Sequence, residues 1–275
     1  MGLALESRFP LNDGRAMPVL GLGVWQVPAG AVARRAVLEA FKVGYRHVDT
    51  AKLYGNEADV GIAVRDSGLA RDDVFVTTKL WNSDHGTESA LRAGRESLKR
   101  LGLDAIDLYL IHWPVPRLRG ESWDALIRLK EDGVARSIGV SNYTVRHLEE
   151  MRKTSGVVPA VNQVEFNPFL FQRDLLEYCV AHGILLEAYS PLMKGRRLDD
   201  PTISGVAKAH GRTPAQIVLR WALQHDVAVI PKSVRPERIR ENCRLFDFAL
   251  SADQMRALDG LDERRHTSWN PDEIE

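Results

Sequence analysis

The sequence contains little cysteine and none of the common metal-binding motifs. Only Cys179 and Cys243 occur among 275 residues, without a Cys-x-x-Cys or His-Glu-x-x-His pattern. A disulfide framework needs several cysteines, and a structural zinc site needs closely spaced ligands. We therefore expect neither a disulfide scaffold nor a metal site, and we expect the protein to work in a reducing cytoplasm.

An excess of one charge and a long hydrophobic run are also missing. The chain carries 37 Lys and Arg against 37 Asp and Glu, so bulk charge would not drive binding to nucleic acid or to a membrane surface. No run approaches the ~20 apolar residues of a transmembrane helix, and the first residues lack the apolar core of a secretory signal. We expect a protein that is neither exported nor anchored, and in which any anion site is local.

Short β-branched runs alternate with segments of helical periodicity along most of the chain. Such alternation predicts a parallel sheet whose strands are connected by helices. Eight strands are predicted, at residues 19–22, 45–48, 74–78, 106–111, 137–140, 160–164, 185–189 and 227–230. Apolar residues that recur three and four positions apart predict helices at 33–42, 87–100, 122–130 and 173–181.

Three additions to this repeat are predicted. Residues 9–18 carry the turn sequence Asn12-Asp13-Gly14 and predict a hairpin that could close the floor of a barrel. Extra helices are predicted at 214–224, with Thr213 as the N-cap, and at 252–258. We expect one domain over residues 1–275, with residues 1–18 as a hairpin cap and 262–275 as an irregular tail.

The alternative fold is a doubly wound dinucleotide-binding sheet, whose fingerprint is Gly-x-Gly-x-x-Gly between a strand and a helix. Gly21 and Gly23 are followed by Trp25 and Gln26, and the third glycine is missing. The sequence therefore favours an α/β (β/α)8 TIM barrel.

Polar residues follow the predicted strands one after another. Asp49, Lys79 and His112 stand at the ends of three of them, where barrel enzymes assemble their active sites. Taken singly, Asp49 could be a helix cap, Lys79 a solvated cation, and Tyr54 a packed surface aromatic. Their concentration at one end of the barrel favours a shared site.

Three segments resemble the signatures of the aldo-keto reductase superfamily. The first covers residues 44–51 with Tyr54 to Glu57, the second covers 136–143, and the third covers 230–233 with Arg238, Glu241 and Asn242. The resemblance spans essentially the whole chain. Within the superfamily the sequence is most similar to compact bacterial members of the 2,5-diketo-D-gluconate reductase type.

The resemblance implies a catalytic tetrad of Asp49, Tyr54, Lys79 and His112. In such an enzyme hydride reaches a carbonyl carbon and the oxygen needs a proton, which Tyr54 would supply. A free phenol has a pKa of about 10, so we expect the Lys79 cation to lower the pKa of Tyr54. Asp49 would hold Lys79, and His112 would orient the carbonyl oxygen.

The same comparison implies NADPH as cofactor. Ser141, Asn142 and Gln163 would bind the nicotinamide carboxamide, and Tyr189 would stack on the ring. The remaining cofactor contacts implied are Ser190 and Leu192 at the pyrophosphate, Lys232, Ser233 and Arg238 at the adenosine 2′-phosphate, and Glu241 and Asn242 at the adenine.

For the substrate, the resemblance implies a small carbonyl compound and a monomeric enzyme. Trp25, Trp81, Trp113 and Trp269 are expected to wall the pocket, whereas Trp123 and Trp221 are expected in the core. Residues 114–121 and 193–201 are short relative to long-loop members, so we expect an open site for aldehydes, dicarbonyls or keto sugars.

Two other functions remain open from the sequence. Lys79 at a strand end could form an imine, as in Schiff-base lyases, although Asp49 beside it would keep the amine charged. The chain could also be an NADPH-binding sensor or structural module without turnover, because fold does not dictate function.

Overall fold

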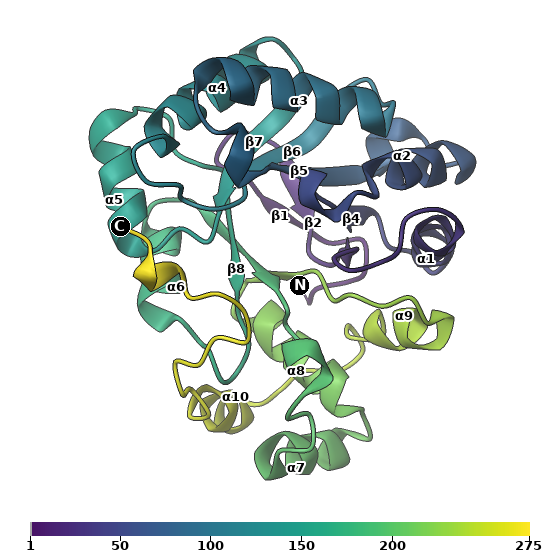
Figure 1. Cartoon of the computed structure of the whole chain (residues 1–275). Coiled ribbons are helices and arrows are strands. Elements are labelled where there is room, and N and C mark those ends of the chain that lie inside the picture. Colours follow the sequence, from purple (N-terminus) through teal and green to yellow (C-terminus); the bar gives the residue numbers. More distant parts are fainter. Residues whose placement is uncertain (1) are drawn as a thin grey trace.

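Eight parallel strands curl into a barrel surrounded by helices (Figure 1). The computed structural model describes residues 2–275. In chain order the barrel strands are β3 (Leu22–Gly23), β4 (His47–Asp49), β5 (Phe75–Leu80), β6 (Ile106–Ile111), β7 (Ala135–Ser141), β8 (Val161–Glu165), β9 (Leu185–Tyr189) and β10 (Ala228–Val229). Each strand pairs with its neighbour in sequence. This confirms the predicted α/β barrel, with every predicted strand segment at or next to an observed strand.

The barrel closes between its first and last strands. Parallel bridges join Leu20 to Val229 and Gly23 to Lys232. The closure requires close backbone approach, because a Cβ atom on Gly23 would lie 2.8 Å from the carbonyl oxygen of Ile230. The glycine is therefore needed here for space.

In residues 2–275, ten α-helices surround the barrel, eight of them between its strands and two after the last strand. They are α1 (Ala31–Lys42), α2 (Glu57–Asp66), α3 (Thr87–Leu101), α4 (Arg119–Glu131), α5 (Val145–Thr154), α6 (Arg173–Ala181), α7 (Pro201–His210), α8 (Pro214–Gln224), α9 (Pro236–Asn242) and α10 (Ala252–Asp259). The extra helix at 214–224 is confirmed, and its predicted cap Thr213 accepts a hydrogen bond from the Gln216 amide. Helices α2, α5, α7 and α9 were not among the helices named from the sequence.

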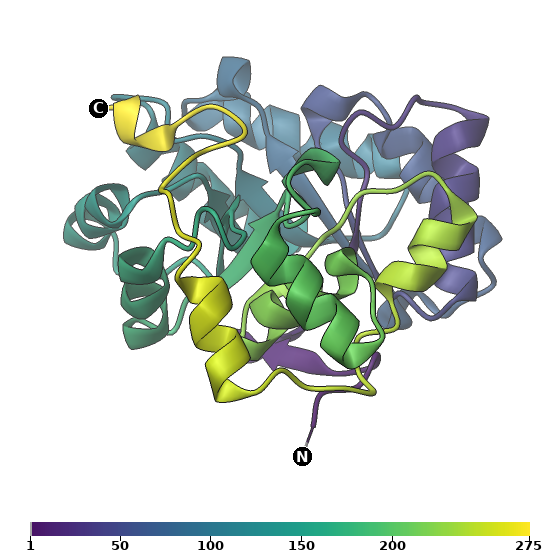
Figure 2. The same ribbon diagram turned by 90° about the horizontal axis from the view of Figure 1, so that it is seen from below.

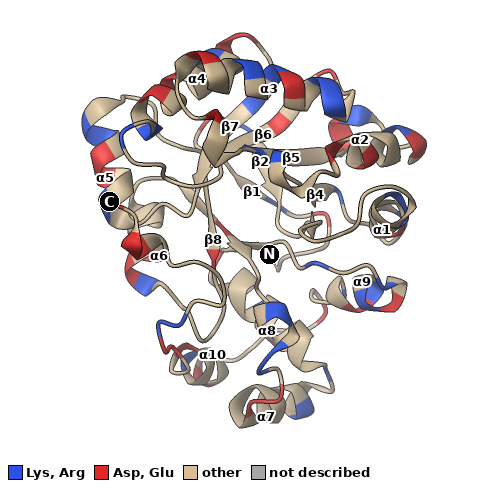
Figure 3. Cartoon of the chain, in the orientation of Figure 1, with Lys and Arg blue, Asp and Glu red and all other residues tan. Residues whose placement is uncertain are grey.

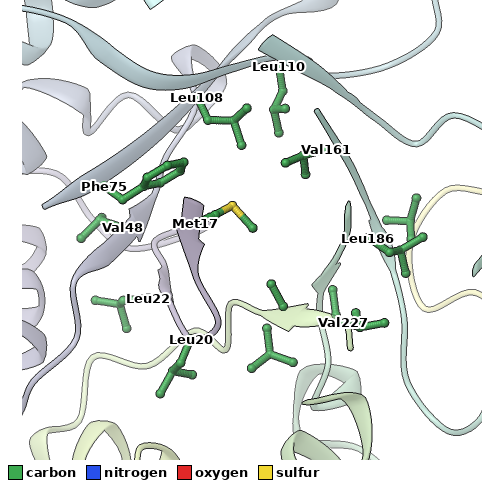
Figure 4. Close-up of a cluster of buried hydrophobic side chains, with 14 of the residues drawn as sticks. Met17, Leu20, Leu22, Val48, Phe75, Leu108, Leu110, Val161, Leu186 and Val227 are labelled. Atoms are coloured by element: carbon green, nitrogen blue, oxygen red, sulfur yellow. The ribbon is translucent and has the colours of Figure 1, made fainter. Parts of the chain in front are cut away.

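The floor of the barrel is sealed by an antiparallel hairpin of β1 (Arg8–Pro10) and β2 (Ala16–Pro18). Met17 is fully buried and points toward apolar side chains from the barrel strands, among them Phe75, Leu108 and Val161 (Figure 4). Figure 2 shows this hairpin at one end of the molecule and the C-terminal segment running up to the opposite end. The predicted hairpin is confirmed, and it leaves the opposite end of the barrel for a site.

Charged residues lie mainly on the outer helices, where both signs alternate (Figure 3). Trp123 and Trp221 are buried, as expected. None of the helices described for residues 2–275 combines the length and the apolar character needed to cross a bilayer.

Candidate active site

Four polar side chains meet at the carboxyl ends of neighbouring strands. Lys79, on β5, is fully buried, and its Nζ lies 2.7 Å from each carboxylate oxygen of Asp49 at the end of β4. The same ammonium lies 2.8 Å from the Thr50 carbonyl oxygen and 3.4 Å from the Tyr54 hydroxyl. The ring of His112, which follows β6, lies 5.8 Å from the ring of Tyr54. The structure thus brings together the four residues expected to form a tetrad.

The loop that carries Tyr54 is fixed by buried polar contacts. Tyr54 ends a short 3-10 helix, η1 (Lys52–Tyr54), and Gly55 follows with a φ of 68°, a conformation that glycine adopts without strain. The buried Asn56 side chain accepts a hydrogen bond from Thr50 and donates to the Val24 and Val27 carbonyls. These contacts hold the phenol against the ammonium.

The expected effect on the pKa of Tyr54 was wrong in sign. Burial, together with the negative charges of Asp49 and Glu187, raises the pKa of Tyr54 well above its usual value. The prediction weighed only the attraction of Lys79 for the phenolate, and it left out the burial of the phenol and the charge of Glu187. The phenol therefore keeps its proton at neutral pH, which suits a proton donor.

His112 is a neutral imidazole in this environment. Burial, and secondly the charge of Lys79, lowers the pKa of His112 well below its usual value. Within the described chain its Nδ1 is buried without a hydrogen-bond partner. Because a buried N–H without an acceptor is more costly than an unpaired acceptor, we assign the single proton to Nε2, which is then free to donate to a ligand.

A hydrogen-bonded platform stands beside the tetrad. The Tyr189 hydroxyl donates to Oδ1 of Asn142 at 2.8 Å, and the amide nitrogen of Asn142 donates to the His112 carbonyl at 2.9 Å. The Ser141 hydroxyl donates to the backbone carbonyl oxygen of Gln163 at 2.8 Å. Asn142 and Ser190 have φ values of 63° and 46°, and such strained backbone is typical of functional sites. Ser141, Asn142, Gln163, Tyr189 and Ser190, which were all expected at the cofactor, thus lie next to one another beside the tetrad.

One buried residue of the site was not expected. Glu187, in the middle of β9, is fully buried, and the amide nitrogen of Gln163 donates to both Glu187 and Asp49, at 2.7 and 2.8 Å. The signal in the sequence was an acidic residue inside the apolar strand Leu185–Tyr189. A charge in such a place is rarely buried without a specific role.

Farther from the tetrad lie the residues expected at the phosphates and adenine. Lys232 and Arg238 are exposed, and neither forms an ion pair in residues 2–275. Ser233, which lies between them in the sequence, is buried, and its hydroxyl accepts a hydrogen bond from the Arg235 amide. Leu192 is half-buried in the loop after β9. Glu241 accepts a hydrogen bond from Thr213 at 2.8 Å, and Asn242 is buried at the end of α9.

The four tryptophans expected to wall the substrate pocket occur in three aromatic contacts. Trp25 packs on Tyr54 with ring centroids 4.8 Å apart, and Trp81 packs on His112 at 5.2 Å. Trp113 contacts Trp269 of the tail at 5.6 Å.

The tail itself is docked rather than free. The Glu165 carboxylate, at the end of β8, accepts hydrogen bonds from the backbone amides of Thr267 and Ser268 at 3.0–3.2 Å. Farther along, the Arg119 side chain donates to the carbonyl oxygen of Glu275 at 2.6 Å. The 3-10 turn η5 (Pro271–Glu273) lies between these anchors. The sequence did not indicate this arrangement.

Comparisons with known proteins agree with the geometry. The model of the aldo/keto reductase family matches residues 19–263. The glyoxal reductase of Bacillus subtilis (strain 168) is 47% identical over 274 residues, which cover 100% of this chain and 99% of that protein. A crystal structure of an aldo/keto reductase from Brucella melitensis is 51% identical with a TM-score of 0.89, over 93% of this chain and 99% of that one.

A second solved structure was determined with a bound nucleotide. The Bombyx mori aldo-keto reductase in complex with NADP is 35% identical with a TM-score of 0.89, over 97% of this chain and 96% of that one. The likeness in sequence and in fold extends over nearly the full length of each of these chains. The chain therefore belongs to the aldo/keto reductase family and is an oxidoreductase.

Proposed function

We propose that this enzyme reduces aldehydes and ketones to alcohols with NADPH, and that Tyr54 donates the proton. One observation carries the proposal: the Tyr54 hydroxyl lies 3.4 Å from a buried ammonium that is itself paired with Asp49. A phenol that keeps its proton, beside a fixed cation, can protonate an oxygen on which negative charge develops.

The residues present fit a nicotinamide cofactor. The Ser141 hydroxyl is fixed by its hydrogen bond to Gln163, and the Asn142 amide is fixed by its hydrogen bond from Tyr189. Lys232 and Arg238 are exposed cations free of ion pairs in the described chain, with Ser233 between them. Such a set is suited to an adenosine 2′-phosphate, which only NADP(H) carries, so we propose NADPH over NADH. When bound, the cofactor supplies the hydride.

The four residues of the tetrad would orient the carbonyl oxygen and transfer the proton to it. Nε2 of His112 would donate a hydrogen bond to the carbonyl oxygen and orient it. As negative charge develops on that oxygen, the O–H bond of Tyr54 breaks and its proton forms the new alcohol O–H bond. Lys79 stabilises the phenolate left behind, and Asp49 keeps Lys79 charged and oriented.

For substrates we propose small dicarbonyls, keto sugars and aromatic aldehydes. Trp25 and Trp81 contact Tyr54 and His112 directly, so flat and partly apolar groups would be favoured beside the reacting oxygen. The name of the Bacillus relative, glyoxal reductase, points to the dicarbonyl class.

The test is the Tyr54→Phe variant, assayed by the loss of NADPH absorbance with methylglyoxal, phenylglyoxal, a keto sugar and a nitrobenzaldehyde. We expect kcat to fall by roughly a hundred- to ten-thousand-fold, the usual contribution of a general acid. NADPH affinity should stay within a few-fold, because the ring is retained. Tyr178→Phe, on the surface helix α6, is the matched control. A Tyr54→Phe enzyme that keeps most of its kcat would refute the proton-donor assignment.

The two other functions would give different results. An imine needs an unprotonated lysine, whereas the Lys79 ammonium is held by both oxygens of Asp49. Trapping of substrate on Lys79 by borohydride would support the Schiff-base reaction. Tight NADPH binding without turnover of any carbonyl would support a sensor.

A further inference from the structure

Two buried carboxylates, Asp49 of the tetrad and Glu187, accept hydrogen bonds from the same amide group. Asp49 and Glu187 are 2% and 0% exposed, and the side-chain nitrogen of Gln163 donates to both of them. Lys79 pairs directly with Asp49, and no such contact joins it to Glu187 in the described chain. The cluster thus holds one ammonium for two acids, and two charged carboxylates there would leave an uncompensated negative charge.

The second oxygen of Glu187 faces a histidine. Oε1 of Glu187 lies 3.6 Å from Nδ1 of His47, and both atoms are buried without a hydrogen-bond partner in residues 2–275. On the far side of the ring, Nε2 of His47 lies 3.0 Å from the Thr77 hydroxyl. Gly21 makes room for the ring, because a Cβ atom there would lie 2.5 Å from Nδ1.

The charges around this pair favour a proton on the glutamate. Burial, and secondly the nearby Lys79, lowers the pKa of His47 to about 3, so the imidazole is neutral. Burial, and secondly the charge of Asp49, raises the pKa of Glu187 to about 8. The ionisable groups that face Glu187 are His47 and Asp49 from β4, Lys79 from β5 and Tyr54 from η1.

We propose that Glu187 is a positioning residue that holds the Gln163 amide with its nitrogen inward and its carbonyl oxygen toward the cofactor, and that it does so as a neutral acid whose second oxygen faces the neutral imidazole of His47. The cofactor part of this inference rests on the proposed function. Because both acids accept from the Gln163 nitrogen, only its oxygen is left to accept from the nicotinamide carboxamide.

Two variants separate the parts of the proposal. Glu187→Gln mimics the neutral acid: its oxygen can accept from Gln163, and its amide can donate to His47. Glu187→Leu keeps a similar volume but removes the acceptor. We expect Glu187→Gln to bind NADPH like the wild type, measured by quenching of tryptophan fluorescence. Glu187→Leu should bind about tenfold more weakly, the usual effect of one lost hydrogen bond, with kcat reduced much less than the affinity.

The protonation state is tested without cofactor. At pH 6 the infrared spectrum of the wild type should show the carbonyl stretch of a protonated carboxylic acid, and this band should be missing from Glu187→Gln. Because the pKa of Glu187 is raised on folding, the folded state holds the extra proton between pH 4.5 and about 8. Wild-type stability should therefore fall, relative to Glu187→Gln, as the pH rises through that window.

The outcomes distinguish this inference from the proposed function. Loss of affinity in Glu187→Gln equal to that in Glu187→Leu, or no acid band at pH 6, would refute the inference while wild-type NADPH binding stays intact. Wild-type protein that binds no NADPH would refute the proposed function, and with it the cofactor part of the inference.

Discussion

Substitution of Asp49 by Asn tests the centre of the site. The change preserves the shape of the side chain but removes its charge, and the new amide group presents hydrogens to Lys79 or Gln163, which are both donors. The fully buried ammonium then keeps the Thr50 carbonyl at 2.8 Å and the Tyr54 hydroxyl at 3.4 Å. Neither carries a compensating charge.

Breaking a buried ion pair in this way costs about 3–5 kcal/mol. We expect Asp49→Asn to lie near the lower end of this range, because Glu187 loses its negative neighbour and can ionise in its place. For a chain of this size, where 1 kcal/mol shifts Tm by roughly 2–4 °C, the fall in Tm should be on the order of 10 °C. Thermal unfolding followed by circular dichroism measures it.

The pair itself should add little to stability. Burial raises the pKa of Asp49 above its ordinary value, although Lys79 partly offsets this effect. The cost of burying the Asp49 carboxylate thus exceeds what it gains from pairing with Lys79. The double variant Asp49→Asn with Lys79→Met, which removes both charges, should therefore lose less stability than either single variant. Both single variants and the double should lose activity, because the ammonium beside Tyr54 either loses its carboxylate partner or is absent.

The control is Asp132→Asn, which breaks an exposed pair with Arg95 whose members are 49% and 55% exposed at 2.7 Å. Its cost should stay below about 1 kcal/mol. If Asp49→Asn were as mild as this control, or if the double variant cost the sum of the two single variants, the description of a buried, mutually dependent pair would be wrong.

Two further predictions concern the cofactor and the tail. Lys232→Ala or Arg238→Ala should raise the Kd for NADPH by roughly tenfold or more while leaving that for NADH nearly unchanged, since charge-assisted hydrogen bonds contribute about 1.5–3 kcal/mol; equal losses for both cofactors would place the 2′-phosphate elsewhere. Glu165→Gln should loosen the tail and speed proteolytic cleavage near Thr267, with KM raised more than kcat is lowered. Although burial acts against it, the nearby imidazole of His266 and hydrogen bonds from Thr267 and Ser268 lower the pKa of Glu165. In the wild type this anchor is therefore complete above pH 4.5 and lost as the pH falls through the lower folded value. Cleavage rates that are identical in the two proteins at pH 7 would contradict the anchor.

Local pattern in the sequence was enough for the barrel and for three polar residues at its strand ends, whereas the role of Tyr54 came from the family resemblance. Each βα unit has its own periodicity: α6 lies where its apolar spacing placed it, and α8 lies where Pro214 and the Thr213 cap placed it. Asp49, Lys79 and His112 were found because parallel strands end at one face, so a polar residue after each apolar run must lie near the others.

Tertiary structure alone decided the electrostatics of the site and the position of the tail. The pKa of Tyr54 is raised mainly by burial and secondly by Asp49 and Glu187, and Glu187 lies 133 positions away along the chain and reaches the tetrad only through barrel closure. The tail has no periodicity of its own, and it is ordered by Glu165 and Arg119, which other elements supply. Spacing along a chain reports which residues share a face, whereas burial, charge balance and docking depend on distances between segments that no local pattern encodes.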